Sequence, residues 1–293
     1  MIIDAHSHLW LKQDTVVDGK RILSLRNGRS IFMDEEVQML PPFMIDGVNS
    51  AEVFLSNMDY AQVGGAVVVQ EVIDGCQNEY LADVQRRYPD RFFCMGMAWT
   101  VDEAKDVRAK GLKGIAYPGH RMSQSLLSLM PVFKYMEQQG LVLSMCLGES
   151  DRQISEMREV VEECPQLKVA IGHFGMVTTP AFEQQVKLAL SGENVMVESG
   201  GITWLYNSEF YPYPSAIRSI RQAADWVGWE RLMWGSDYPR TITAITYRMS
   251  YDFVSKSREL SDDEKALFLG GNAVRFYGFT DLPDLPYIKN MSE

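Results

Sequence analysis

Short apolar runs alternate with longer amphipathic segments along almost the whole chain. The amphipathic segments carry apolar residues at helical spacing, as at Ile154, Met157 and Val161. The apolar runs are rich in Val, Ile and Met, and their length is typical of buried strands. They comprise residues 2–8, 65–70, 92–98, 112–117, 141–146, 168–173, 195–199 and 232–237.

This pattern predicts an α/β fold in which helices cover a parallel sheet. Strands that are apolar along their whole length need both faces buried, and alternating helices provide this. The eight strand–helix units predict a (β/α)₈ TIM barrel that ends in a C-terminal helix at "GGNAVRFYG". A doubly wound sheet is the alternative, but no G-x-G-x-x-G follows the first strand. No repeat or linker divides the chain, so we expect one domain over residues 1–293.

One segment interrupts the alternation near the N-terminus. Residues 12–49 form a long connection after the first strand. Loops of this length in compact domains are usually functional or disordered. Because the segment starts directly after a histidine pair, we expect a lid or a wall over a pocket, and a surface excursion without a role is the alternative.

Charge and cysteine content narrow the class of protein. The net charge of −11 argues against nucleic acid and anionic membrane surfaces as partners, while a local arginine cluster could still bind a small anionic substrate. No apolar run is long enough to span a membrane. The four cysteines form no C-x-x-C pair and no signal-peptide pattern precedes them, so we expect a reduced, cytoplasmic protein. The oligomeric state is left open.

Histidine and aspartate residues stand where predicted strands end. His6 and His8 are two residues apart on the first strand and therefore share one face. His173 ends the sixth strand and Asp237 the eighth, beside the first in a closed barrel. The carboxyl ends of barrel strands meet at one mouth, where such enzymes carry their chemistry. Imidazole and carboxylate together favour a divalent metal site, with zinc as the expected ion.

Each of these residues alone has a simpler explanation. A pair of histidines on a strand can hydrogen-bond within a polar end of the core, and His173 can be a buried histidine with satisfied partners. Asp237 can cap a turn or a helix. The joint pattern favours a site, because three separate strand ends carry residues of the same chemical kind.

Several motifs extend the pattern to a known family. "DAHSHLW", "YPDRFF", "LKGI", "IGHFG", "RLMWGSDYP" and "GGNAVRFYG" resemble the amidohydrolase-related branch of the amidohydrolase superfamily, from residue 2 to about 278. The resemblance implies a metal-dependent TIM barrel, with lactonases, other hydrolases and non-oxidative decarboxylases among its members. It assigns His6, His8, His173 and Asp237 as metal ligands, and Asp237, with His173, as the catalytic residues.

The chain departs from that family at the fifth strand. Many relatives carry a histidine there, and Cys146 stands in its place in "LVLSMCLGE". Thiolate can bind zinc, but a cysteine on an apolar strand is more often an inert core residue, which is our prediction. The departure makes the chain more similar to the lactonase branch, some members of which act without metal.

Residues near the mouth are candidates for binding substrate. His120 and Arg121 follow the fourth strand, Arg240 follows Asp237, and arginine is the usual clamp for carboxylates. The other candidates at the mouth are Trp204, Tyr238 and Glu198. We therefore expect a hydrolase of a small, carboxylate-bearing cyclic ester or related carbonyl compound. A decarboxylase of an aromatic or unsaturated acid and a non-catalytic metabolite- or metal-binding barrel are the alternatives.

Overall fold

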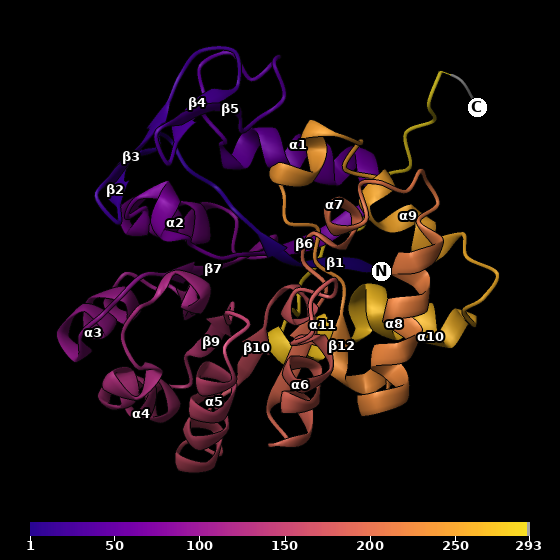
Figure 1. The fold of residues 1–293 in the computed structure, drawn as a ribbon. Coiled ribbons are helices and arrows are strands. Elements are labelled where there is room, and N and C mark those ends of the chain that lie inside the picture. Colours follow the sequence, from indigo (N-terminus) through magenta and orange to yellow (C-terminus); the bar gives the residue numbers. More distant parts are fainter. Residues whose placement is uncertain (292–293) are drawn as a thin grey trace.

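The computed structural model describes residues 1–291, and its centre is one sheet of eight parallel strands in the order β1-β6-β7-β8-β9-β10-β11-β12 (Figure 1). The strands are β1 Ile2–Ser7, β6 Val63–Val68, β7 Phe92–Gly96, β8 Gly114–Tyr117, β9 Val142–Met145, β10 Val169–Ile171, β11 Val195–Glu198 and β12 Leu232–Met233. Each overlaps one of the predicted apolar runs, so the predicted barrel is confirmed.

Hydrogen bonds between the first and last strands close the barrel. The Ala5 amide donates to the carbonyl of Trp234 at 2.9 Å, and the Asp237 amide donates to the carbonyl of His6 at 2.9 Å. The strand β12 is short, but the chain after it continues this pairing as far as Tyr238, which bridges Ser7 in parallel. The segment that carries Asp237 is therefore fastened directly to the segment that carries His6.

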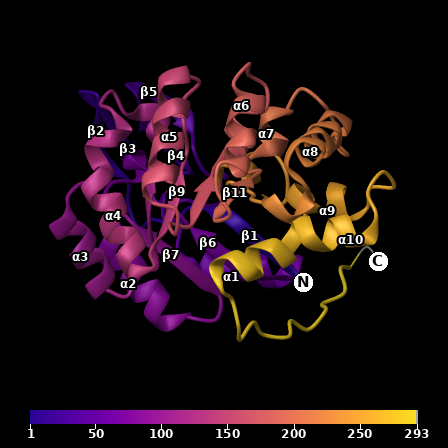
Figure 2. The ribbon, with the colours of Figure 1, turned by 90° about the horizontal axis from the view of Figure 1, so that it is seen from below.

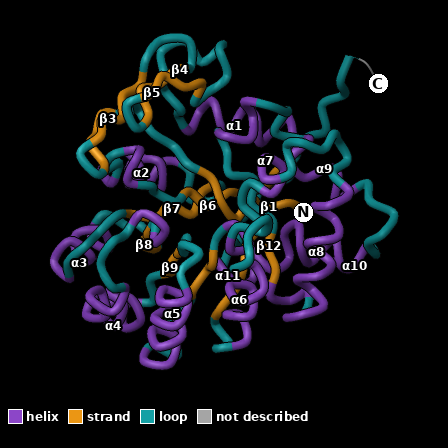
Figure 3. The backbone as a smooth tube through the Cα atoms, in the orientation of Figure 1, coloured by secondary structure: helices purple, strands orange, loops and turns teal. Residues whose placement is uncertain are grey.

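Helices surround the strands on the outside (Figure 3). They are α1 Ala51–Ala61, α2 Asn78–Arg87, α3 Val101–Ala109, α4 Met130–Gln139, α5 Asp151–Glu163, α6 Phe182–Val186, α7 Ile202–Leu205, α8 Pro214–Val227, α9 Met249–Ser255, α10 Asp262–Ala266 and α11 Asn272–Tyr277. Local sequence explains where several begin. At α3 the Thr100 side chain and Glu103 form a capping box, and α8 starts with Pro214 at its first turn.

Apolar side chains fill both sides of the strands. The larger cluster lies between strands and helices, where Val160 and Val161 of α5 are buried as the helical spacing predicts. A second cluster fills the barrel interior, from Ile3 and Ala5 to Phe276 of α11. Because α11 packs at the end where β1 begins, it plugs the amino-terminal end of the barrel and leaves the carboxyl end for a site.

Residues 12–49 fold differently from the predicted loop. They contain a four-stranded antiparallel sheet in the order β2-β3-β4-β5, which follows β1 and precedes α1 in the chain and lies at the edge of the molecule (Figure 1). Its strands are β2 Asp14–Val17, β3 Lys20–Ser24, β4 Arg29–Phe32 and β5 Glu35–Gln38. The two-residue turn Asp18–Gly19 has positive φ at both positions, 51° and 77°, as a type I′ hairpin requires. We call these four strands the lid sheet.

The chain leaves the barrel after α11 without further regular structure. Residues 279–290 run as an extended segment along the outside of the molecule (Figure 2). The side chain of Gln62, at the end of α1, donates to the carbonyl of Pro286 at 3.1 Å and so fastens part of this segment. Within residues 1–291, no helix combines the length and apolarity that crossing a membrane requires. The one-domain organisation stays a prediction.

Candidate active site

Residues at the carboxyl ends of the barrel strands line one cavity of about 730 Å³. His6 lies on β1, His8 follows it, His173 follows β10 and Asp237 follows β12. All four line the cavity, so the residues that the sequence placed at separate strand ends share one mouth.

Three of these side chains converge on one point. The Nε2 atoms of His6 and His8 are 3.2 Å apart, and Oδ1 of Asp237 lies 3.1 Å from Nε2 of His8 and 3.7 Å from Nε2 of His6. The ligands of a tetrahedral zinc ion, at bond lengths of 2.0–2.2 Å, lie about 3.4 Å apart. The three atoms are therefore already spaced as ligands of one small divalent ion.

Hydrogen bonds orient two of the imidazoles through their outer nitrogen. Nδ1 of His8 donates to the carbonyl of Val69 at 3.1 Å, and Nδ1 of His173 donates to the carbonyl of Gly200 at 2.7 Å. A carbonyl can only accept, so Nδ1 carries the proton and Nε2 is left with a lone pair in the neutral ring. Metal-binding histidines are held in the same way in known sites.

Glu198 orients the imidazole of His6 by accepting a hydrogen bond from its outer nitrogen. Its Oε1 accepts from Nδ1 of His6 at 2.7 Å and from the His173 amide at 3.3 Å, and the carboxylate is fully buried. Burial alone would raise the pKa of Glu198, but the charge of His6 and its hydrogen bond outweigh burial and lower it. The sequence suggested Glu198 as a pocket residue, whereas its carboxylate holds the imidazole of His6 and the backbone amide of His173.

Charge complementarity sets the protonation of His8 and Asp237. Burial opposes charge on His8, but the hydrogen bond with Asp237 and the charge of Asp74 raise its pKa to about 9. Burial alone would raise the pKa of Asp237, yet the hydrogen bond from His8 and the charge of His173 hold it well below its usual range. Without a metal, a proton on Nε2 of His8 therefore occupies the place that an ion would take.

The second oxygen of Asp237 is held from the opposite side. Nε1 of Trp204 donates to Oδ2 at 2.7 Å, while the guanidinium of Arg240 lies 3.7 Å from the centre of the same indole. Trp204, predicted to bind substrate, lines the cavity, and its polar atom orients the aspartate. Arg240 lines the cavity, and no carboxylate within residues 1–291 forms an ion pair with it.

The backbone is unusual at two site residues. His173 and Asp237 both adopt a φ of 58°, in the left-handed region that non-glycine residues rarely enter. Asp4 supports the second of these turns, because its buried carboxylate accepts from the Ser236 amide at 2.8 Å and from the Tyr247 hydroxyl at 2.7 Å. Rare backbone geometry that its surroundings stabilise is a frequent feature of functional sites.

The remaining predicted substrate residues differ in their surroundings. His120 and Arg121 line the cavity, and Nε of Arg121 donates to Oε2 of Glu71 at 2.8 Å. Tyr238 does not line it: its ring is fully buried and stacks on Phe54 at 4.0 Å between centroids. The left-handed turn at Asp237 sends the next side chain into the core, so the prediction of a substrate contact for Tyr238 is corrected to a packing role.

A buried polar chain joins the lid sheet to the site. Nε2 of Gln13 donates to Oδ1 of Asp74 at 3.0 Å, and the hydroxyl of Ser30 donates to Oε1 of Gln13 at 3.2 Å. Asp74 in turn lies 3.7 Å from Nδ1 of His8. Phe32, from the same sheet, lines the cavity. The expected pocket wall is thus present, and no sequence motif had indicated Gln13 or Asp74.

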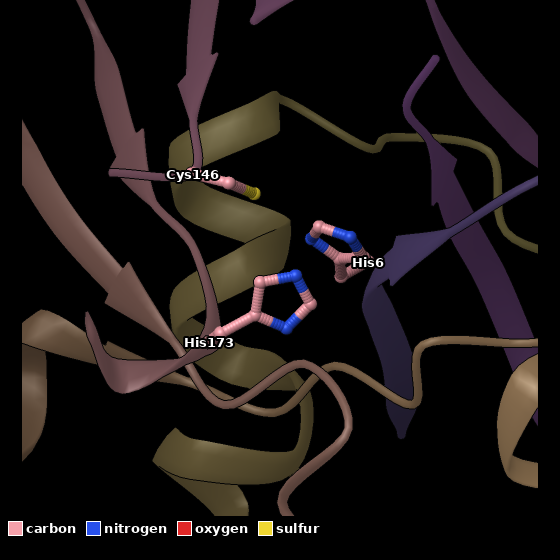
Figure 4. A group of neighbouring side chains, drawn as sticks. All are labelled: His6, Cys146 and His173. Atoms are coloured by element: carbon pink, nitrogen blue, oxygen red, sulfur yellow. The ribbon is translucent and has the colours of Figure 1, made fainter. Parts of the chain in front are cut away.

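Cys146 is not part of the apolar core that the sequence suggested. It follows β9, is half-buried and lines the cavity. Its sulfur is directed towards the rings of His6 and His173 (Figure 4). Burial, followed by the charge of Glu198, raises the pKa of its thiol well above the ordinary value.

Comparison with known proteins identifies the family of this chain. The model of the amidohydrolase family matches residues 3–279. The chain belongs to the amidohydrolase family. Among curated proteins, none matches the sequence.

Several solved structures share the fold of this chain at low sequence identity. A probable 2-pyrone-4,6-dicarboxylic acid hydrolase from Acinetobacter baumannii, with citric acid bound, has a TM-score of 0.72 at 20% identity, covering 95% of this chain and 99% of that chain. An amidohydrolase from Burkholderia multivorans with bound zinc has a TM-score of 0.72 at 18% identity, covering 97% of this chain and 100% of that chain. A manganese-bound 5-carboxyvanillate decarboxylase from Novosphingobium aromaticivorans has a TM-score of 0.55 at 18% identity, covering 78% of this chain and 80% of that chain.

Proposed function

We propose that this amidohydrolase is a zinc-dependent hydrolase of a small, carboxylate-bearing lactone or related carbonyl compound. The observation that carries the proposal is the convergence of His6, His8 and Asp237 on one point, beside a cavity lined by Arg240, which forms no ion pair within residues 1–291. The hydrolase from Acinetobacter baumannii, with citric acid bound, supports the substrate class by analogy.

The ligand set supports zinc. His6 and His8 present ring nitrogen through Nε2, Asp237 presents oxygen, and the outer nitrogens of the rings already have acceptors. A bound zinc ion would polarise the substrate carbonyl and lower the pKa of water at the site. Nitrogen and oxygen donors in this combination are common in catalytic zinc sites.

Asp237 is the proton carrier of the proposed mechanism. Its low pKa keeps it ionised at neutral pH, so it can accept a proton from the attacking water. The hydrogen bond from Trp204 to Oδ2 prevents the carboxylate from rotating freely. The proton that Asp237 takes from water can then pass to the leaving oxygen. Nε2 of His173 faces the cluster (Figure 4) and, because Nδ1 carries the ring proton, can accept a hydrogen bond from the attacking water.

Arg240 binds the substrate carboxylate in this proposal. The guanidinium is held over the indole of Trp204 and has planar donors suited to a carboxylate. Arg121, whose Nε is engaged by Glu71, and His120 supply further donors across the cavity. Phe32 and other lid-sheet residues would cover the apolar part of the substrate and limit entry of bulk water.

Metal analysis and a substrate panel test the proposal together. The protein purified without chelators should contain about one zinc per chain and hydrolyse at least one carboxylate-bearing lactone, with acid release followed by a pH indicator. Asp237→Asn should abolish the signal. Release of CO₂ from aromatic acids without lactone hydrolysis would support a decarboxylase, and tight binding with no product would support a non-catalytic barrel. Either result would overturn the hydrolase.

A further inference from the structure

The main chain at Cys146 is held rigidly by both neighbouring strands. Its amide donates to the carbonyl of Tyr117 at 3.0 Å, and its carbonyl accepts from the His120 amide at 2.9 Å. The residue before it, Met145, accepts from the Gly172 amide at 3.0 Å. The barrel itself therefore fixes the main chain from which the Cys146 side chain extends.

Gly172 leaves the space that the sulfur occupies. A Cβ atom at this position would lie 2.6 Å from Sγ of Cys146 and 2.9 Å from Oε1 of Glu198. The backbone does not demand glycine, because φ is −81° and ψ is 157°, which any residue adopts. The requirement for glycine is therefore spatial, because a larger residue would displace the sulfur or the Glu198 carboxylate.

The sulfur belongs to a second group of ligand atoms that shares His6 with the first. Sγ of Cys146 and one nitrogen each of His6 and His173 lie within 4.8 Å of one another. Figure 4 shows that the sulfur and the two rings face a common space. Sulfur and nitrogen ligands of one zinc ion lie about 3.5 Å apart, so a side-chain movement of about 1 Å brings the sulfur into range.

We propose that Cys146 binds a zinc ion together with His6 and His173, at a position that shares His6 with the cluster of His6, His8 and Asp237, and that its sulfur makes the site selective for zinc over manganese or magnesium. This inference rests on the proposed metal site. As the sulfur–metal bond forms, the thiol loses its proton to solvent. Thiolate favours zinc, whereas manganese and magnesium favour oxygen ligands, so a sulfur donor changes which ion is retained.

Cobalt substitution tests the proposal without an activity assay. Metal-free wild-type protein titrated with Co²⁺ should show d–d bands and, in addition, a near-ultraviolet thiolate-to-cobalt charge-transfer band. Cys146→Ser should keep the d–d bands and lose the charge-transfer band. Cys76→Ser removes an exposed thiol away from the cavity and should leave both unchanged.

Competition with a chromophoric chelator then measures selectivity. Zinc affinity should fall by at least about tenfold in Cys146→Ser, since even the outer partners of metal ligands are worth that much. Manganese affinity should change much less. Wild-type protein with d–d bands but no charge-transfer band would overturn the sulfur ligand and leave the metal site intact. No Co²⁺ binding at all would overturn both the ligand and the metal-dependent hydrolase.

Discussion

Trp204 and Asp237 are joined by a 2.7 Å hydrogen bond from the indole nitrogen to Oδ2, which leaves Oδ1 for the imidazoles of His6 and His8. One carboxylate thus has two separate tasks for its two oxygens. Because Arg240 stacks on the same indole, the aspartate and the arginine share one rigid support. Proton handling and substrate binding are therefore coupled through Trp204, and substitutions can separate them.

Asp237→Asn should lower kcat by about 10²-fold or more, in the range of lost acid–base groups. Asparagine keeps the size of the side chain but lacks the basic carboxylate. Folding should persist, because the core of the barrel is untouched, and thermal unfolding checks this. The assay needs excess zinc, so that metal loss is not mistaken for a lost base. Near wild-type turnover in a folded variant would show that the base lies elsewhere.

Trp204→Phe should lower kcat about tenfold and change KM little. It removes a hydrogen bond to a charged acceptor, worth about 1.5 kcal/mol or more, which corresponds to about a factor of ten in rate. Arg240→Gln is the matched variant and should raise KM about tenfold or more with a smaller effect on kcat. Steady-state kinetics of both variants, with one substrate, distinguish the roles. Identical effects on kcat and KM would contradict the division of tasks.

Glu198→Gln should weaken zinc binding about 10–100-fold, because the amide no longer fixes the tautomer of His6 as a carboxylate does. Chelator competition measures this affinity. Glu149→Gln serves as the control, since Glu149 is an exposed carboxylate that lines the same cavity. Equal zinc affinities for the two variants would show that Glu198 does not position His6 for zinc binding.

The metal-free protein should lose stability between about pH 6.5 and pH 9. The pKa of His8 rises from 6.5 to about 9 on folding, so its contribution is complete below pH 6.5 and disappears as pH rises through 9. The raised pKa values of Asp4 and Asp74, about 6, affect stability at lower pH. Thermal unfolding from pH 6 to 10 measures the trend. A slope that persists unchanged in His8→Asn would contradict its assignment to His8.

Hydrogen exchange should slow in the lid sheet when a substrate analogue saturates the cavity. Phe32 lines the cavity and Gln13 connects the sheet to Asp74, so a ligand should restrict both. Peptides from residues 14–38 should show the effect, and peptides from α10 should not. Unchanged exchange in the sheet would make it a static surface element.

The barrel could be predicted from sequence because its strands are buried on both faces and stand out as apolar runs. The lid sheet could not be predicted in this way, since its strands are half exposed and their apolar signal is weak. Its turns nevertheless have a sequence signal, because Asp18–Gly19 and Asn27–Gly28 are dipeptides typical of hairpins. All four of these residues adopt positive φ. Attention to turn residues would have replaced the predicted loop with strands.

The ligand cluster could be predicted because parallel strands of a barrel end at one rim. Its supporting contacts could not, since they join residues far apart in sequence: Glu198 reaches His6, and Trp204 reaches Asp237. The error at Tyr238 has a related cause. Strand alternation was no guide to its direction, because the preceding residue adopts a left-handed conformation.

The lid sheet leaves and re-enters the barrel at a single point. Trp10 and Asn49 pair as an antiparallel bridge, with backbone hydrogen bonds of 3.0 and 2.9 Å in the two directions. Because the two ends of this segment are already held together, the segment can be replaced by another insert as a unit. The replacement should change the entropic cost of closing the loop only slightly. Asn49 must stay, because its side chain also donates to the carbonyl of His8. This junction is where we would graft lids from other barrels to change which substrates enter.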